Sequence, residues 1–278
     1  MEHSVLLMRI VTLVLIGVAL LGLLSWGLTR MQGVMLFHPA PLSGVDPASL
    51  GVTCETVSIK EYDGTTLGAW WCPAADDGRP VLLFLHGNAG NREGRLHNVR
   101  GLQEAGIAVL IVDYRGYGES SGIPTESGLI RDALAAYDWL AERVAPRPVA
   151  IFGRSLGGVL GALVALERDP AGLILESTFT SLRAITRHVL PVPMLHLLVR
   201  SRLDTLSAVR ELTLPLMVVH GTDDELVPVA MGRALHAASP VTHKVLHEVP
   251  GGQHNDTYLK AGPAYFQWIR EFLDGLRP

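Results

Sequence analysis

Residues 149–167 read VAIFGRSLGGVLGALVALE, and this stretch decides the fold. Its first part, VAIFG, is a short apolar run without alternation, which favours a strand buried on both faces. Its last part, LGGVLGALVALE, is typical of a helix. Between them, Gly-x-Ser-x-Gly at 153–157 places Ser155 at the centre of a sharp turn. A strand, a strained turn and a helix in this order expose the serine hydroxyl, so Ser155 is a candidate nucleophile.

The same alternation continues on both sides of this turn. Further apolar runs lie at residues 80–87, 106–114, 171–177, 214–221 and 243–249, and helix-like stretches at 93–105, 126–143 and 258–276. Strands buried on both faces that alternate with helices indicate a parallel sheet covered on both sides. Before them, TCETVSIK and TTLGAWWC join around Asp63-Gly64, which predicts an antiparallel hairpin. We therefore expect an α/β fold with about eight mostly parallel strands.

Composition excludes several classes of function. The 278 residues are 48% hydrophobic and 18% charged, which suffices for a sizeable core. The net charge of -4 gives no basic surface for a phosphate backbone, so nucleic acid is not expected as a partner. The sequence has no His-Glu-x-x-His, Cys-x-x-Cys or P-loop motif, and it predicts no metal and no cofactor.

The N-terminal segment has the features of a membrane anchor. Residues 10–28 read IVTLVLIGVALLGLLSWGL without a charge, close to the roughly 20 residues that cross a bilayer as a helix. We expect a transmembrane helix there, with a short tail at 1–9 and a linker at 29–50. A cleaved signal peptide and a buried core helix are the alternatives. Arg9 and Arg30 flank the segment equally, so its orientation in the membrane stays open.

The two cysteines lie in the predicted hairpin. Counting outward from Asp63-Gly64 places Cys54 and Cys72 almost opposite each other. They form either a cross-strand disulfide, which would imply an oxidising compartment, or two unpaired and partly buried thiols. The sequence leaves both interpretations open.

A serine nucleophile needs a base, and the base needs a partner that holds its tautomer. Three carboxylates follow the run LPLMVVHG, and among them we prefer Asp224 to Asp223 as the acid. His254 follows the last strand in a glycine-rich loop before the final helix, and we expect it to be the base. The chain order serine, aspartate, histidine is the order that α/β-hydrolases use.

The loop HGNAGN, at residues 86–91, follows another predicted strand. Its glycines let the backbone approach a reacting carbonyl closely, so the N–H of Asn88 is expected to stabilise an oxyanion, with Ala89 as the next choice. Leu156 begins the helix after the nucleophile, and its N–H is the expected second donor. His86 is expected to brace the loop by hydrogen bonds.

Six motifs together resemble the α/β-hydrolase superfamily from about Phe37 to the C-terminus: LFLHGNAGN, DYRGYGESSGIPTE, GRSLGG, LESTF, HGTDDELVP and GGQHND. The chain looks most like its membrane-anchored members with one N-terminal helix, relatives of depalmitoylating thioesterases and monoacylglycerol lipase. The resemblance implies an α/β-hydrolase domain at 51–278 that cleaves esters or thioesters through an acyl-enzyme, without a cofactor. It assigns the triad to Ser155, Asp224 and His254, and the oxyanion donors to Asn88 and Leu156.

The resemblance also bears on the substrate. Residues 178–213 correspond to a lid insertion, and VLPVPMLHLLV at 189–199 makes this lid apolar. An apolar lid beside a membrane anchor favours acyl chains from lipids or lipidated proteins. The segment DYRGYGESSG is expected to pack beneath the site, shaped by Arg115 and Tyr117. The alternatives are a prolyl-oligopeptidase-like serine peptidase and a non-catalytic binding protein of the same fold; the sequence does not define the oligomeric state.

Overall fold

The computed structural model describes Arg9, Thr12, Leu15, Gly17 and residues 36–75, 78–189 and 201–276. The chain divides into two compact units, Met1–His38 and Pro39–Pro278. Residues 39–50, which we assigned to a linker, belong to the second unit. Nearly all of the predicted transmembrane segment and residues 190–200 of the predicted lid lie outside the described residues. Among those that are described, no helix has the length and apolar character needed to span a membrane.

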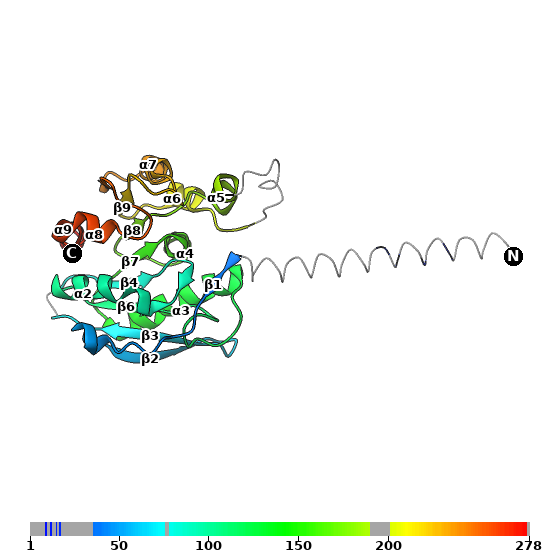
Figure 1. The fold of residues 1–278 in the computed structure, drawn as a ribbon, viewed down its shortest axis with the longest axis horizontal. Helices are drawn as coiled ribbons and strands as arrows, with labels where there is room; N and C mark the ends of the chain where they lie inside the picture. The colour runs from blue at the N-terminus through cyan, green and yellow to red at the C-terminus, as the bar shows by residue number, and fades with distance from the viewer. Residues whose placement is uncertain are drawn as a thin grey trace. The chain divides into compact units, whose positions relative to one another are not determined.

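An eight-stranded sheet forms the centre of the second unit, in the order β10-β9-β8-β7-β4-β6-β3-β2 (Figure 1). The strands are β2 (Glu55–Lys60), β3 (Thr66–Cys72), β4 (Val81–Leu85), β6 (Val109–Val112), β7 (Val149–Arg154), β8 (Leu173–Glu176), β9 (Leu216–Gly221) and β10 (Lys244–Val249). The pairs β2–β3 and β3–β6 are antiparallel and all other pairs are parallel. The predicted α/β-hydrolase fold is confirmed. Two short strands, β1 (His38–Pro39) and β5 (Ala89–Gly90), lie outside this sheet.

Helices cover both faces of the sheet (Figure 1). They are η1 (Pro47–Leu50), η2 (Arg92–Arg95), α2 (Leu96–Glu104), α3 (Glu126–Val144), α4 (Leu156–Glu167), α5 (Leu182–Val189), α6 (Thr205–Glu211), α7 (Val229–Ala238), α8 (Thr257–Ala261) and α9 (Pro263–Asp274). Helices α2 and α9 share a core cluster with Phe84 and Phe152 on one face. On the other face Gly161 of α4 lies against Ile151 and Leu173.

One predicted helix is interrupted. We expected a single helix at 258–276, but α8 ends before Gly262 and α9 begins at Pro263. Gly262 has φ 57°, a left-handed conformation that breaks the helical path. Proline lacks the N–H that a continuous helix requires and is favoured at the first position of a new one. The prediction of one continuous helix was therefore wrong at this point.

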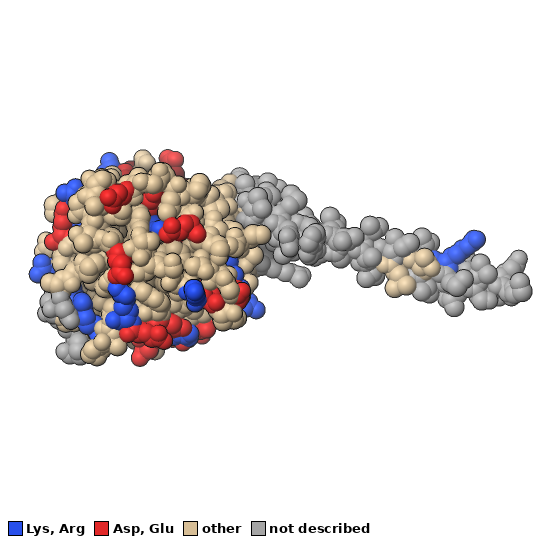
Figure 2. Space-filling model, turned by 90° about the horizontal axis from the view of Figure 1, so that it is seen from below, with Lys and Arg blue, Asp and Glu red and all other residues tan. Residues whose placement is uncertain are grey.

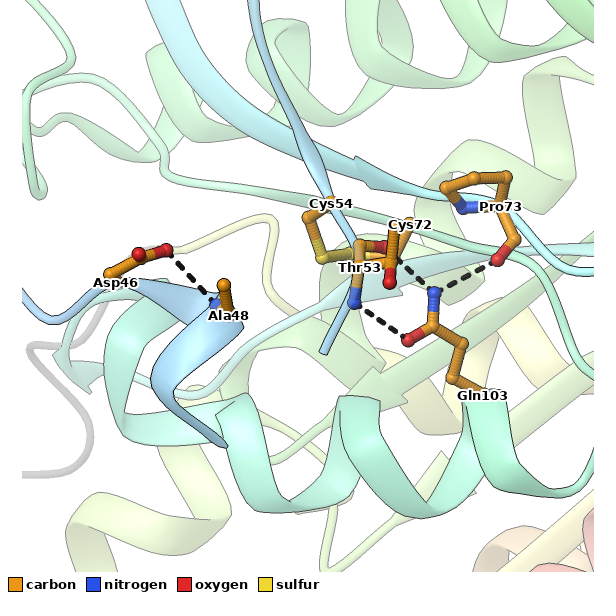
Figure 3. Close-up of a disulfide and its surroundings, with 7 residues drawn as sticks. All are labelled: Asp46, Ala48, Thr53, Cys54, Cys72, Pro73 and Gln103. Atoms are coloured by element: carbon orange, nitrogen blue, oxygen red, sulfur yellow. Dashed lines mark hydrogen bonds between the residues drawn. A yellow bond between two sulfur atoms is a disulfide. The ribbon is translucent and has the colours of Figure 1, made fainter. Parts of the chain in front are cut away.

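The predicted hairpin is closed by a disulfide between Cys54 and Cys72, whose Cα atoms lie 4.1 Å apart (Figure 3). The register that pairs Glu55 with Trp71 brings the two cysteines opposite each other. Gln103 of α2 also links the two sides of the hairpin beside the disulfide. Its side-chain oxygen accepts from the N–H of Thr53, and its side-chain nitrogen donates to the carbonyls of Thr53 and Pro73. Of the two interpretations that the sequence left open, the structure has the disulfide.

The topology brings four chain segments to one edge of the sheet. Strands β4, β7, β9 and β10 are mutually parallel through their neighbours, so their carboxyl ends lie at the same edge. The loop at 86–91 follows β4, Ser155 follows β7, Asp224 follows β9 and His254 follows β10.

The face of the molecule seen in Figure 2 carries acidic and basic side chains side by side, without an extended basic area.

Candidate active site

Ser155 lies in the turn between β7 and α4, with φ 52° and ψ -116°. A side chain in this strained region is rare and must be held by its surroundings. The turn is tight: a Cβ on Gly153 would overlap the backbone of Gly157 and Gly158, and one on Gly157 would overlap that of Leu85. Ser155 occupies the N-cap position of α4, but its hydroxyl makes no capping hydrogen bond. The hydroxyl is therefore available for chemistry.

The other two residues of the predicted triad line up with this hydroxyl. His254 Nε2 lies 3.2 Å from Ser155 Oγ, and His254 Nδ1 lies 2.8 Å from Asp224 Oδ2. The aspartate carboxylate accepts from Nδ1–H, which leaves the lone pair of Nε2 facing the serine hydroxyl. The side chain of His254 is 13% exposed and that of Asp224 is fully buried. Asp223, the alternative acid that the sequence offered, bonds Thr222 instead.

The loop after β9 holds Asp224 as an anion. Its Oδ1 accepts from the backbone N–H groups of Leu226 and Val227 at 3.0 and 2.8 Å. Its Oδ2 lies 3.5 Å from Nε2 of the buried His220, which also donates to the Val227 carbonyl at 2.7 Å. Burial alone would raise the pKa of Asp224, but hydrogen bonds with His220, His254 and Val227 hold this pKa well below its usual range.

Side chains fix the peptide units of the candidate oxyanion loop. His86 Nδ1 donates to the Gly87 carbonyl at 2.7 Å, and the Tyr117 hydroxyl lies 2.9 Å from the Asn88 carbonyl. In a trans peptide the carbonyl and the following N–H point in opposite directions. The first bond therefore orients the N–H of Asn88, and the second orients the N–H of Ala89. Leu156, whose N–H is the other candidate donor, is the first residue of α4.

The side chains of the segment DYRGYGESSG contact two different parts of the molecule, the candidate oxyanion loop and the region of α3 and the hairpin. Tyr114 donates to the His86 carbonyl at 2.8 Å, and Tyr117 contacts both carbonyl oxygens of Asn88. Arg115, which we expected to shape the site, bonds Asp132 of α3 and Glu61 instead. The tyrosines thus support the candidate oxyanion loop, whereas the arginine ties the segment to α3 and to the hairpin.

Arg115 contacts three carboxylates, of which Asp132 and Glu61 are buried and Asp63 is exposed. Its guanidinium contacts Asp132 at 2.7 Å, Glu61 at 3.0 Å and Asp63 at 3.2 Å. Burial, followed by hydrogen bonding with Asp132, raises the pKa of Glu61 to about 8. Burial and the neighbouring Asp132 therefore favour the protonated form of Glu61 at neutral pH, although Arg115 bonds Glu61 and Arg131 lies 3.9 Å from it.

Arg154 has a role that the sequence did not reveal. It is 2% exposed, and its Nη2 donates to the His254 carbonyl at 2.6 Å and to Asn255 Oδ1 at 3.2 Å. Beside it on β8, Glu176 is fully buried and accepts from Thr257 and Tyr265. The available signal was an arginine at the end of an otherwise apolar strand.

Metal chemistry has no candidate site in residues 36–75, 78–189 and 201–276, or at the few described positions before them. No group of three or more His, Cys, Asp or Glu side chains there could hold an ion.

Comparison with known proteins places the chain in a family. Residues 76–203 and 184–257 match the hydrolase family described as "Hydrolase_4: Serine aminopeptidase, S33". The chain belongs to this family of α/β-hydrolases. Among its relatives, an uncharacterised protein of Mycobacterium tuberculosis is 37% identical over 84% of this chain and 83% of its own length. The α/β hydrolase domain-containing protein WAV2 of Arabidopsis thaliana is 34% identical, with the same two coverages.

Two further proteins, a lipase and an esterase, are similar to this chain. The lysophosphatidylserine lipase ABHD12 of Xenopus tropicalis is 34% identical over 82% of this chain and 66% of its own length. The esterase Pf2001 of Pyrococcus furiosus has the same fold, with a TM-score of 0.72 and 19% identity over 87% of this chain and 98% of the esterase.

Proposed function

We propose that this chain is a membrane-anchored serine hydrolase that cleaves carboxylic esters or thioesters of acyl chains through an acyl-enzyme on Ser155. The observation that carries the proposal is the continuous contact from Asp224 through His254 to Ser155, at 2.8 and 3.2 Å. A structural histidine would have no reason to lie between a buried carboxylate and the hydroxyl of a strained serine.

In the first half-reaction, Ser155 Oγ attacks the acyl carbonyl while His254 Nε2 accepts the hydroxyl proton. Asp224 holds the imidazole in the required tautomer and stabilises the imidazolium that forms. The N–H groups of Asn88 and Leu156 stabilise the negative charge on the carbonyl oxygen. The tetrahedral intermediate collapses as His254 returns the proton to the leaving alcohol or thiol, which departs and leaves the acyl group on Ser155.

In the second half-reaction, water attacks the ester bond of the acyl-enzyme. His254 takes a proton from this water, and the same N–H groups stabilise the second oxyanion. When the intermediate collapses, the proton passes to Ser155 Oγ and the carboxylic acid leaves. No cofactor takes part in either step, because all proton transfers run through one imidazole.

Acyl chains are the proposed substrate class for two reasons. The predicted lid contains the apolar run at 189–199, and a lipase is among the relatives. Long-chain acyl groups would bury against such a lid at about 0.8 kcal/mol for each methylene group. We therefore propose that long-chain esters and thioesters are preferred to acetyl esters.

The proposed anchor is the apolar segment at 10–28. The disulfide between Cys54 and Cys72 adds a proposal about its orientation, since such bonds persist in oxidising compartments. The hydrolase unit would then face the oxidising side of the membrane. Membrane fractionation of the full chain and of a form that begins at Pro39 tests the anchor: only the full chain should need detergent for release.

Active-site labelling tests the nucleophile. A fluorophosphonate probe should label the parent and Ser58→Ala, an exposed serine on β2, but not Ser155→Ala. Turnover of p-nitrophenyl esters should fall by about 10⁶-fold in Ser155→Ala. A Ser155→Ala protein with full activity would overturn the proposed mechanism.

A substrate series tests the acyl preference. With p-nitrophenyl acetate, octanoate and palmitate, kcat/KM should rise with chain length. An aminoacyl p-nitroanilide tests for peptidase activity, since the alternative weighed from the sequence is a prolyl-oligopeptidase-like peptidase and the family description names an aminopeptidase. Faster cleavage of the anilide than of every ester would reverse the assignment. A protein that the probe does not label and that hydrolyses none of these compounds would be a binding protein.

A further inference from the structure

Arg95 lies beside the candidate oxyanion loop. It is the last residue of η2, and its Nη2 donates to the Ala89 carbonyl at 3.2 Å. A Cβ placed on Gly87 would lie 3.4 Å from Ser155 Cβ and 4.0 Å from Arg95 Nη2. The guanidinium group and Ser155 therefore both lie within 4.0 Å of the same point beside Gly87.

This guanidinium group lacks an anionic partner among the residues that the structure describes. The Nε atom of Arg95 is buried and makes no hydrogen bond. The hydrogen bond that Nη2 donates goes to a neutral acceptor, the carbonyl of Ala89. Arg92, three positions earlier, shows the usual arrangement, because it pairs with Asp113 and Glu119. Arg95 is only partly buried, but its buried Nε has lost water without gaining a partner. Such a donor is costly to leave unpaired, so a cation of this kind next to a nucleophile calls for a ligand.

The surroundings of Arg95 have an excess of positive charge. Arg154 lies close enough to disfavour its charge, and the described residues that Arg154 itself bonds, His254 and Asn255, offer it neutral oxygens. Glu176 attracts Arg95, but its carboxylate oxygens already accept from Thr257 and Tyr265. Burial and the proximity of Arg154 lower the pKa of Arg95 to about 10, so it remains a cation at neutral pH.

We propose that Arg95 forms a subsite for an anionic group of the substrate, a phosphate linked to the acyl ester that Ser155 attacks. The inference rests on the proposed serine hydrolase function and adds the residue that would select a charged head group. A guanidinium group suits a phosphate because its planar donors bond two oxygens at once. The Nε that has no partner and the Nη groups would supply these donors.

Two substrates with the same acyl chain test the subsite in the full-length protein. Oleoyl lysophosphatidylglycerol carries a phosphate next to the acyl glycerol, and monooleoylglycerol lacks it. Arg95→Gln should lower kcat/KM for the phospholipid by about 10- to 100-fold, the usual loss for a hydrogen bond to a charged group. The variant should change kcat/KM for monooleoylglycerol by less than about threefold, because this substrate has no charged group for Arg95 to bind.

Two further variants complete the test. Arg95→Lys should retain part of the preference for the phospholipid, because it keeps the charge but loses the planar donors. Arg100→Gln removes an exposed arginine of α2 and should change neither rate. Equal losses on both substrates in Arg95→Gln would overturn the subsite.

Labelling separates this inference from the function on which it rests. If Arg95→Gln takes up the fluorophosphonate probe like the parent and loses only phospholipid turnover, the subsite is supported. If neither Arg95 variant takes up the probe, Arg95 is a structural residue and the subsite is refuted. If Ser155→Ala hydrolyses both lipids at the parent rate, the failure lies in the proposed function instead.

Discussion

The guanidinium group of Arg154 donates to the backbone carbonyl of His254 at 2.6 Å. Arg154 directly precedes Ser155, so one side chain joins the turn of the proposed nucleophile to the loop of the proposed base. The second bond, to Asn255 Oδ1, fixes the same loop one residue further on. The distance between Ser155 Oγ and His254 Nε2 therefore depends on Arg154, although Arg154 does not touch either atom in the described contacts.

Replacing Arg154 should impair the chemistry more than substrate binding. Arg154→Gln leaves the His254 loop without its buried support, and a displacement of about 1 Å there can cost about 100-fold in rate. We expect kcat to fall by about this factor with little change in KM, and Arg154→Lys to recover part of the loss. Arg233→Gln, which removes an exposed pair with Glu248, is the control. Equal losses in the Lys and Gln variants, together with a lower unfolding temperature, would instead indicate a purely structural role.

Tyr117 should support catalysis through Asn88. In Tyr117→Phe the ring stays and the hydroxyl that contacts the Asn88 carbonyl at 2.9 Å is lost. Asn88 then loses this contact at its carbonyl and at its Oδ1, so its N–H is held less firmly, and one lost hydrogen bond predicts a fall in kcat of about tenfold. Tyr62→Phe is the matched control, because Tyr62 is 88% exposed. Unchanged kcat in Tyr117→Phe would mean that the loop keeps its geometry without this bond.

Most of the sheet could be predicted from the sequence because its strands are buried on both faces. The run before Ser155 is apolar along β7 except for Arg154, and the run after Asp63-Gly64 is mostly apolar along β3. The structure moved only the ends of these predicted strands. The interruption at Gly262 was visible in the sequence as Gly-Pro, yet a final helix without a break was expected. There the turn chemistry prevailed over the apolar periodicity.

The candidate site was predictable only where local motifs mark it. Ser155 sits in a Gly-x-Ser-x-Gly turn, whereas Arg154 fills a position that this motif leaves open, and Arg95 belongs to no motif that we recognised. The contact of Arg154 with His254 arises because the loop after β10 returns to the end of β7. His220 is similar, since its bond to Val227 exists only when the Asp224 loop is folded. Neighbours of this kind depend on topology and not on sequence spacing.

The carboxylate cluster around Arg115 should make stability depend on pH. The pKa of Glu61 is raised from 4.5 to about 8 in the folded protein, so folding takes up a proton between these values. The stabilisation is complete below about pH 4.5 and is lost as the pH rises through about 8. Glu61→Gln lacks this dependence, because its amide does not titrate.

Unfolding of the parent and of Glu61→Gln should therefore be compared at several pH values from 5 to 9 (about the window that the shifted pKa defines). The parent should lose stability relative to the variant as the pH rises. Glu104→Gln is the control, because Glu104 is 63% exposed and pairs only with Arg100. A constant difference between parent and Glu61→Gln across this window would show that Glu61 is already ionised in the folded protein.

The disulfide should stabilise the fold without affecting the chemistry. Cys54 and Cys72 are separated by 18 positions, and closing a loop of this size is worth about 3 kcal/mol. Cys72 pairs with Val109 at the amino end of β6, whereas Ser155 lies at the carboxyl end of the parallel strands. The Cys54→Ser, Cys72→Ser double variant should thus unfold more easily but keep the parent kcat at 25 °C. Denaturant unfolding with and without reductant checks this, because reduction should bring the parent to the stability of the double variant and leave that variant unchanged. Equal stability of the oxidised parent and the double variant would show that the bond contributes nothing to the folded state.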